Sequence, residues 1–378
     1  MARFTCPYCY EVYDKSKVKY YCTKCTRSTA NPGKEPVKCL CKELIITRLC
    51  PVCMIDHSGV RNGTNEIPKD AFETPNFNFS IMGMSSSGKT NYITVMLNEL
   101  MHSTGNWFAM NDQTNDTRDL QKLNYSEMRQ GRVPPGTLRG DPIPQIWKIK
   151  NLLQKGSGFF SRNHVPTYTF TIYDGAGEDH LDPRMIRYIR SSEAFIIVLD
   201  PLMLEGARNY VDPGAIDASL GSHVDIDANA NTIVERLSST LLEIKGLKAG
   251  TKLNMPIAVV LTKFDTVINH PAFANAMVRN KSLRIENGKV REEEFEQIHN
   301  EIEHWLKEIG EQSFINSLNG SFATFDKKGN IKERHYNFFA VSSYGQTPDM
   351  AGSVTAKLDP HRVLDPILWL FKKKKFID

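Results

Sequence analysis

The segment from Gly83 to Thr90 contains the residues whose types and spacing point most directly to chemistry. It reads Gly-Met-Ser-Ser-Ser-Gly-Lys-Thr and matches the pattern G-x-x-x-x-G-K-[ST] at each fixed position. Glycines let the backbone N–H groups of such a loop turn toward an anion, and a following helix adds its partial positive charge. Lys89 can reach the outer phosphates of a nucleoside triphosphate, and the Thr90 hydroxyl can bind Mg²⁺. The expected phosphate-loop contacts are Gly83, Ser86, Ser87, Gly88, Lys89, Thr90 and Asn91.

A second set of reactive side chains lies upstream, where all 8 cysteines fall within residues 6–53. They form four close pairs: Cys6 with Cys9, Cys22 with Cys25, Cys39 with Cys41, and Cys50 with Cys53. Two such pairs can bind one tetrahedral zinc ion, so the pattern predicts two structural zinc sites. Sequential pairing of the four pairs is favoured because it closes shorter loops, and an interleaved arrangement of the first pair with the third is the alternative. His57 is a further possible ligand.

The phosphate loop needs a strand before it and a helix after it, and the sequence offers both. Residues 77–82 form an apolar-rich run, and residues 91–97 can open a helix with one apolar face. Four further apolar runs predict strands at 168–173, 194–199, 257–261 and 338–341, with helical patterns at 232–244 and 295–309. This alternation predicts an α/β fold of the P-loop NTPase kind, with a doubly wound, mostly parallel sheet and a small N-terminal zinc ribbon.

Polar residues follow these strands, at the edge where a parallel sheet binds its ligands. Asp174 directly follows the run 168–173 and can hold Mg²⁺, directly or through water. Gly177, three residues later, can offer its backbone N–H to a γ-phosphate. We therefore expect Thr90 and Asp174 to be the magnesium ligands and Gly177 to be a phosphate contact.

A further group of residues has the chemistry to recognise a purine base. Asp265 can accept hydrogen bonds from the N1–H and the 2-amino group of guanine, and the aliphatic stem of Lys263 can cover the ring. A backbone N–H of Ser342 or Ser343 can meet the guanine O6. Adenine lacks this donor–donor–acceptor edge, so the pattern, with Thr262 in the same motif, favours GTP and GDP as ligands.

The ordered set of motifs resembles that of P-loop GTPases of the translation-factor-related, Ras-like class (the TRAFAC class). These motifs are Gly83–Thr90, Asp174–Gly177, Thr262–Asp265 and Ser342–Ser343, and the resemblance covers roughly residues 76–372. The cysteine-rich start and residues 362–370 are also similar to bacterial double-GTPase families of conflict and defence gene clusters. The resemblance implies hydrolysis of GTP to GDP with Mg²⁺ and the role of a molecular switch, in the narrower case within an anti-phage system.

The chain departs from this family at positions that bear on turnover. Thr262 stands where an asparagine is usual, and it keeps a hydroxyl while losing an amide. Glu178 stands where Ras-like enzymes often carry a glutamine, so it either orients the attacking water or marks slow turnover. Thr137 is the candidate for the threonine that closes over Mg²⁺, with Thr114 and Thr117 as alternatives. The expected catalytic residues are Lys89, Glu178 and Thr137.

The chain divides, by composition, into a double zinc ribbon at 1–58, a polar linker at 59–75 and a GTPase domain at 76–378. Insertions at about 202–231 and 270–335, together with the ribbon, are expected to contact a protein partner or a second subunit. The ribbon is locally basic and rich in tyrosine, so nucleic acid is a possible but less favoured ligand. The alternative function is a nucleotide-binding scaffold or ATPase regulator with little turnover, whose ribbon binds nucleic acid or protein.

The overall composition is that of an ordinary globular protein. Of the 378 residues, 40% are hydrophobic and 24% charged, and the net charge is +4. No apolar run approaches the roughly 20 residues that a membrane span needs, and the first residues have no apolar signal core. We therefore expect a cytoplasmic protein, in which clustered cysteines bind metal rather than form disulfides.

Overall fold

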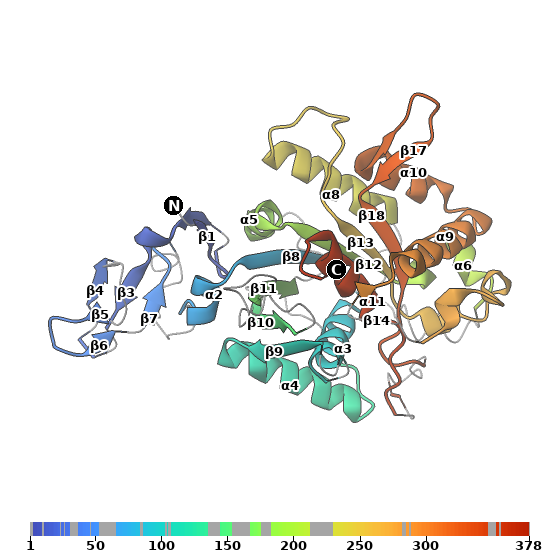
Figure 1. Ribbon diagram of the computed structural model, residues 1–378. Helices are drawn as coiled ribbons and strands as arrows, with labels where there is room; N and C mark the ends of the chain where they lie inside the picture. The colour runs from blue at the N-terminus through green and yellow to red at the C-terminus, as the bar shows by residue number, and fades with distance from the viewer. Residues whose placement is uncertain are drawn as a thin grey trace.

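The central feature of the structure, a computed structural model of the chain, is a seven-stranded sheet flanked by helices, with a small cysteine-rich module at one end (Figure 1). The structure describes residues 3–9, 11–22, 24–25, 27–30, 37–45, 47–52, 66–83, 86–102, 104, 107–134, 144–152, 167–174, 183–211, 230–281, 285–286, 289–346, 353–354 and 357–377. Within these residues, no helix is long and apolar enough to cross a membrane.

The strands of the sheet lie in the order β18-β13-β12-β8-β11-β10-β9. Their bounds are β8 Asn76–Gly83, β9 Phe108–Asp112, β10 Gln145–Asn151, β11 Thr167–Asp174, β12 Ala194–Leu199, β13 Ile257–Leu261 and β18 Tyr336–Ala340. The five strands from β18 to β11 run parallel, whereas β10 is antiparallel to both of its neighbours. The prediction of a mixed α/β fold with a mostly parallel sheet is confirmed, and the strand before the phosphate loop, β8, lies near the centre.

Strands β12 and β13 send alternate side chains into two separate cores. In β12, Ile196 and Val198 face one core, while Phe195 and Ile197 face the other. Since both of their faces are buried, β12 and β13 are apolar along their whole length, as predicted. The helix after the phosphate-loop motif and the C-terminal helix pack on the first face, and helices between them in the sequence pack on the second.

The helices divide between these two faces (Figure 1). Helices α3 (Lys89–His102), α4 (Asn115–Arg129) and α11 (Asp365–Lys373) contribute to the first core. Helices α5 (Pro183–Ser191), α8 (Ala230–Ile244) and α10 (Gln312–Phe322) contribute to the second. Helix α9 (Glu292–Glu308) supplies Phe295 to the first core and Trp305 to the second, so it closes the edge of the sheet beside β18.

The two regions expected to be insertions differ in how much they add to the core. The described part of 202–231 holds a short helix, α6 (Glu205–Arg208), after the 3-10 turn η2 (Pro201–Met203). The region 270–335 contains α9 and α10, and also η5 (Pro271–Phe273), η6 (Met277–Arg279), β14 (Ile285–Glu286), β15 (Lys289–Val290), β16 (Ala323–Phe325) and β17 (Ile331–Arg334). The second region is therefore part of the sheet's hydrophobic cover as well as of its surface.

The cysteine-rich module is built from very short strands around two small clusters of buried residues. Its elements are β1 (Arg3–Thr5), β2 (Val12–Asp14), η1 (Lys15–Lys17), β3 (Lys19–Tyr21), β4 (Ser28–Ala30), β5 (Val37–Lys38), β6 (Leu44–Ile45) and β7 (Thr47–Leu49). Strand β3 pairs with both β4 and β7, and β5 pairs with β6. A module with so little apolar core needs a further source of stability, and metal binding is a common one.

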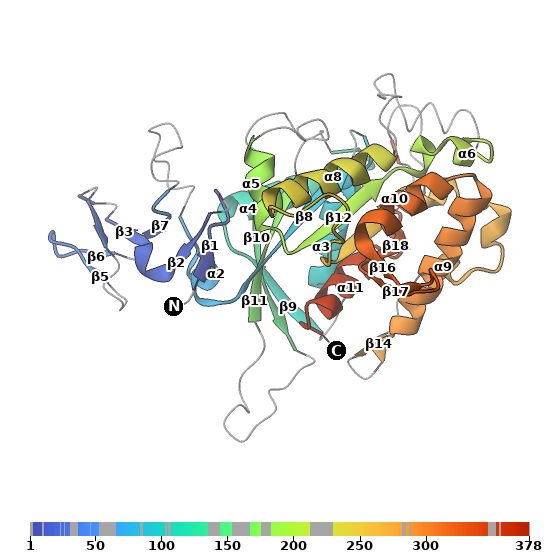
Figure 2. The same cartoon turned by 90° about the horizontal axis from the view of Figure 1, so that it is seen from above.

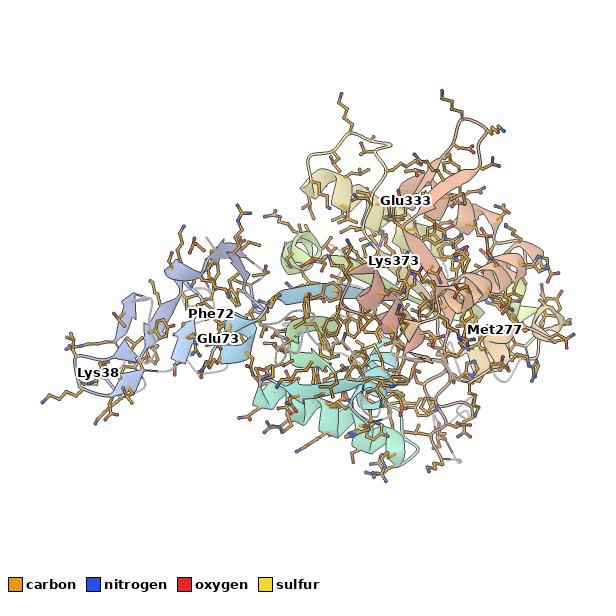
Figure 3. All side chains as sticks on the ribbon, in the orientation of Figure 1. Lys38, Phe72, Glu73, Met277, Glu333 and Lys373 are labelled. Carbon is orange, nitrogen blue, oxygen red and sulfur yellow. The ribbon has the colours of Figure 1, made fainter. Side chains whose placement is uncertain are left out.

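The segment before β8, which the sequence suggested to be a linker, packs on both parts of the chain. It contains α2 (Lys69–Glu73), and Ile67 is fully buried in the module's core beside Phe4 and Cys50. The N–H of Ile67 donates to the carbonyl of Arg48 at 2.8 Å. On the other side, Asp70 forms an ion pair with Lys148 of β10. Figure 2 shows α2 between the module and the sheet, and Figure 3 labels Phe72 and Glu73 of this helix.

Candidate functional site

The predicted phosphate-loop motif lies between the end of β8 and the start of α3, and residues 84–85 are outside the described residues. Gly83 ends β8, and a Cβ atom there would lie 2.4 Å from the carbonyl oxygen of Val198, so only glycine fits. Gly88 has a φ of +81°, which favours glycine, and Lys89 opens α3. The Nζ atom of Lys89 donates to the Gly83 carbonyl at 2.9 Å, in a buried position. The Lys89 side chain therefore reaches back to the end of β8.

Thr262, the residue that replaces the usual asparagine, joins the phosphate loop to the end of β13. Its hydroxyl lies 2.6 Å from the carbonyl oxygen of Ser87 and 3.1 Å from that of Leu199. Its backbone N–H also donates to the Leu199 carbonyl at 2.9 Å. Since a hydroxyl supplies the donor here, the loss of the amide does not separate the two loops.

Lys263 lies across the phosphate loop and is paired with an acid that the sequence reasoning did not select. Its Nζ atom is 2.6 Å from Oδ2 of Asp200, and its Cε atom lies 4.0 Å from the position of a Cβ built on Gly88. Asp200 is 1% exposed and directly follows β12. The sequence position of Asp200 could have identified it. Asp200 is the polar residue at the carboxyl end of the buried strand β12, and β12 pairs with β13, the strand that precedes Lys263.

The two loops expected to recognise the base are neighbours. Asp265 lies in a 3-10 turn, η4 (Phe264–Thr266), and the Phe264 N–H donates to the carbonyl of Val341, next to Ser342. Ser342 and His361 exchange backbone hydrogen bonds of 3.0 and 2.8 Å. Ser342 and Ser343 are both buried. The structure therefore places the Thr262–Asp265 and Ser342–Ser343 motifs side by side, beside the phosphate loop.

His361 was not expected at this place and connects the two base loops. Its ring stacks on Phe264, with centroids 5.7 Å apart, and its Nε2 lies 2.7 Å from the carbonyl oxygen of Val278. Burial lowers the pKa of His361 below its ordinary value. A neutral imidazole therefore supports the loop that carries Asp265.

The proposed magnesium ligands come from adjacent elements. Thr90 is in the first turn of α3, and Asp174 ends β11, which runs parallel to β8 with Asp174 opposite Ile81. A hydroxyl and a carboxylate are oxygen donors of the kind that Mg²⁺ takes, so the donor set fits the ion. Gly177, Glu178 and Thr137 lie outside the described residues, and their roles stay predictions.

The alternatives to Thr137 have other tasks. Thr114 is the N-cap of α4, where its hydroxyl accepts from the N–H of Thr117 at 3.1 Å. The Thr117 hydroxyl is buried and accepts from the N–H of Ile146 at 3.0 Å. Both hydroxyls therefore support the helix and the neighbouring strand β10.

The cysteines form two groups, and the expected sequential pairing is wrong. Within each group the sulfur atoms lie within 4.8 Å of one another. The groups are Cys22, Cys25, Cys39 and Cys41, and then Cys6, Cys9 and Cys50, with Cys53 and the possible ligand His57 outside the described residues. The second pair thus joins the third and the first joins the fourth, so the alternative of first with third is also wrong.

Strand pairing explains this nested arrangement. In the antiparallel pair β3–β7, Lys19 lies opposite Leu49 and Tyr21 opposite Thr47. Cys50 is therefore carried to the start of β3, near β1, while Cys22 lies at the other end, near the β5–β6 hairpin. Long-range strand pairing overrides the advantage of short loops.

The cysteine groups have the dimensions of a metal site. The Sγ atoms of Cys25 and Cys39 are 3.3 Å apart, those of Cys22 and Cys41 3.6 Å, and those of Cys9 and Cys50 3.5 Å. Four thiolates around zinc, with bonds of about 2.3 Å, lie roughly 3.8 Å from one another. The backbone N–H of Cys25 is the main cause that lowers the pKa of Cys22 to about 7. Both groups therefore fit zinc.

Comparisons with known proteins give little further guidance. No protein-family model matches the chain, and no curated protein matches its sequence. Among solved structures, the chain is similar to a bacterial selenocysteine-specific elongation factor, EF-Sec, with 14% sequence identity and a TM-score of 0.27. The match covers 79% of this chain and 29% of that one, so the chain spans less than a third of that structure.

Proposed function

We propose that the protein is a GTPase that binds GTP at Gly83–Thr90 and hydrolyses it to GDP with Mg²⁺. The observation that carries the proposal is the joining of two motifs with complementary chemistry. The Thr262 hydroxyl lies 2.6 Å from the Ser87 carbonyl oxygen, so the phosphate-loop motif and the base motif are in direct contact. A triphosphate on one motif brings a purine within reach of the other.

The base side selects guanine. The Asp265 carboxylate accepts from the N1–H and the 2-amino group, and a backbone N–H of Ser342 or Ser343 meets O6. Lys263 covers the base with its aliphatic stem, which already lies beside Gly88. Adenine offers no such edge, so binding of ATP is expected to be weaker.

The phosphate side stabilises charge during in-line attack of water on the γ-phosphate. Lys89 and the loop amides bind the β- and γ-phosphate oxygens. Negative charge develops on these oxygens in the transition state, so the same hydrogen bonds become stronger there. Thr90 and Asp174 would hold Mg²⁺, which supplies charge neutralisation between the two phosphates. Gly177 contacts the γ-phosphate, Thr137 closes over the site and Glu178 orients the water.

We further propose that the protein uses GTP binding and hydrolysis as a cytoplasmic molecular switch. The γ-phosphate orders the segments that contain Thr137 and Gly177, and its loss releases them. The double zinc ribbon at 1–58 and the surface of the regions 202–231 and 270–335 contact a protein partner or a second copy. The resemblance of the motif order and the cysteine-rich start to bacterial double-GTPases favours a place in a conflict or anti-phage system.

Nucleotide titration and phosphate release test the proposal. Wild-type protein is expected to bind GTP and GDP more tightly than ATP and to release phosphate from GTP only with Mg²⁺. Lys89→Ala abolishes the release, and Asp265→Ala removes the preference for guanine. Tighter binding of ATP, with no effect of Asp265→Ala, contradicts the guanine assignment. Binding of GTP without phosphate release above the Lys89→Ala control favours the scaffold alternative.

A further inference from the structure

Asp200 forms an ion pair with Lys263, one of the proposed nucleotide contacts. It follows β12 directly, its side chain is almost fully buried, and both of its oxygens have partners. Oδ1 accepts from the N–H of Leu202 at 2.9 Å, and Oδ2 lies 2.6 Å from Nζ of Lys263. We infer that Asp200 is a positioning residue that holds Lys263 over the base side of the nucleotide site, an inference that rests on the proposed GTPase function.

The backbone fixes the direction of the carboxylate. Asp200 is the N-cap of η2, and Pro201 follows it in the first position of that turn. Strands β12 and β13 run parallel with Leu199 opposite Leu261, so Asp200 and Lys263 leave the same edge of the sheet. The carboxylate is therefore aimed by its own cap, independently of any nucleotide.

Fixing the long side chain of Lys263 before a nucleotide binds lowers the entropy cost of binding. A lysine side chain has four rotatable bonds, and ordering them costs conformational entropy. Its backbone has a φ of +51°, in the left-handed region. With Nζ fixed on Asp200, the stem lies beside Gly88 before any ligand arrives. The ordering cost is then part of folding rather than of nucleotide binding.

A double-mutant cycle tests this role. In Asp200→Asn, the amide oxygen can still accept from the Leu202 N–H, while its NH₂ group faces the lysine as a second donor. The variant is expected to weaken GDP and GTP binding by about tenfold each, with kcat unchanged, because Lys263 touches the base and not the reacting phosphate. In a Lys263→Met background the same substitution is expected to change affinity by less than about twofold.

The outcomes separate the possible roles. An equal loss of affinity in both backgrounds means that Asp200 only supports the fold, and it overturns the inference. If Asp200→Asn does not fold, as judged by its thermal melt, Asp200→Ser keeps the cap without the charge and is measured against the same Lys263→Met background. Failure of the wild-type chain to bind any guanine nucleotide overturns the proposed function, and the inference with it.

Discussion

The Nζ atom of Lys89 lies 2.9 Å from the carbonyl oxygen of Gly83, so the last residues of the phosphate loop are folded back on the first. The ammonium group is buried, and its partner is a backbone atom at the end of β8. A phosphate that enters the loop competes for this ammonium group. Under the proposed function, substitutions at Gly83, as well as substitutions at Lys89, are therefore expected to affect binding.

Gly83→Ala is expected to abolish nucleotide binding. Its Cβ atom would lie 2.4 Å from the Val198 carbonyl oxygen, so β8 or β12 must shift and the loop cannot keep its shape. Isothermal titration with GDP measures the loss. Gly320→Ala is the matched control, because a Cβ there has open space on α10 and is expected to stabilise the protein by about 0.5–1 kcal/mol. Normal binding by Gly83→Ala would contradict the role of this close approach.

Thr262→Val is expected to weaken guanine-nucleotide binding by about tenfold, whereas Thr262→Ser is expected to be nearly neutral. Valine has the shape of threonine but leaves the Ser87 carbonyl without the 2.6 Å donor. Serine keeps that donor. The comparison is made by titration with GDP, and equal affinities of the two variants would show that the hydroxyl bridge is unimportant.

The nested cysteine groups predict which substitutions act on the same ion. Metal analysis of the purified protein is expected to give about two zinc ions per chain, and Cys25→Ser about one. Adding Cys39→Ser to Cys25→Ser should not lower the content further, whereas adding Cys9→Ser should remove the second ion. Sequential pairing predicts the reverse, since Cys25 and Cys9 would then share one site.

The two groups are also expected to differ in their effect on the rest of the fold. Cys6, Cys9 and Cys50 share a core with Ile67, next to α2, whereas Cys22, Cys25, Cys39 and Cys41 contact a separate small cluster. Cys9→Ser should therefore lower the unfolding temperature of the whole chain more than Cys25→Ser. Calorimetry of both variants checks this order, and equal shifts would argue against coupling through Ile67.

Protonation of His299 is expected to destabilise the protein in mild acid. Burial lowers the pKa of His299 well below its ordinary value of 6.5, and its Nδ1 accepts from the N–H of Phe338 at 3.1 Å. The folded state therefore binds fewer protons than the unfolded state below pH 6.5, so this contribution to stability is present above that pH and falls below it. The limiting slope is about 1.4 kcal/mol per pH unit.

Urea unfolding at pH 7.5, 6.5 and 5.5 measures this effect. His299→Gln is the control, because its side chain can accept from the same N–H and has no charge to gain. The difference in unfolding free energy between wild type and His299→Gln should shrink or reverse toward pH 5.5. A difference that does not depend on pH would show that His299 does not titrate in this range.

The sequence predicted the inner strands well because burial on both faces leaves long apolar runs. Strands β12 and β13 begin and end where expected, at Ala194–Leu199 and Ile257–Leu261. Strands β9 and β10 were missed because polar residues interrupt them, as in Gln145–Asn151, and no continuous apolar run marks them. An outer antiparallel strand can alternate in this way because its burial is less uniform.

The strand and the helix that flank the phosphate-loop motif were predicted correctly, because their apolar patterns are local. Contacts between distant segments were missed. Asp200 and His361 act through partners in other segments, Lys263 and Ser342, which no local spacing reveals. The cysteine pairing failed for the same reason, since it depends on which strands pair.

Strand β8 connects the cysteine-rich module with the phosphate-loop motif. At its first residue, the Asn76 amide lies 3.5 Å from the carbonyl oxygen of Thr5 in the cysteine-rich module, and at its last residue the phosphate loop begins. The first and last of the 8 residues of β8 are seven steps apart, and at about 3.3 Å per step this separates the two ends by roughly 23 Å. The cysteine-rich module and the proposed nucleotide site therefore lie at opposite ends of β8, so a partner bound to the module would not compete with a nucleotide for the same surface.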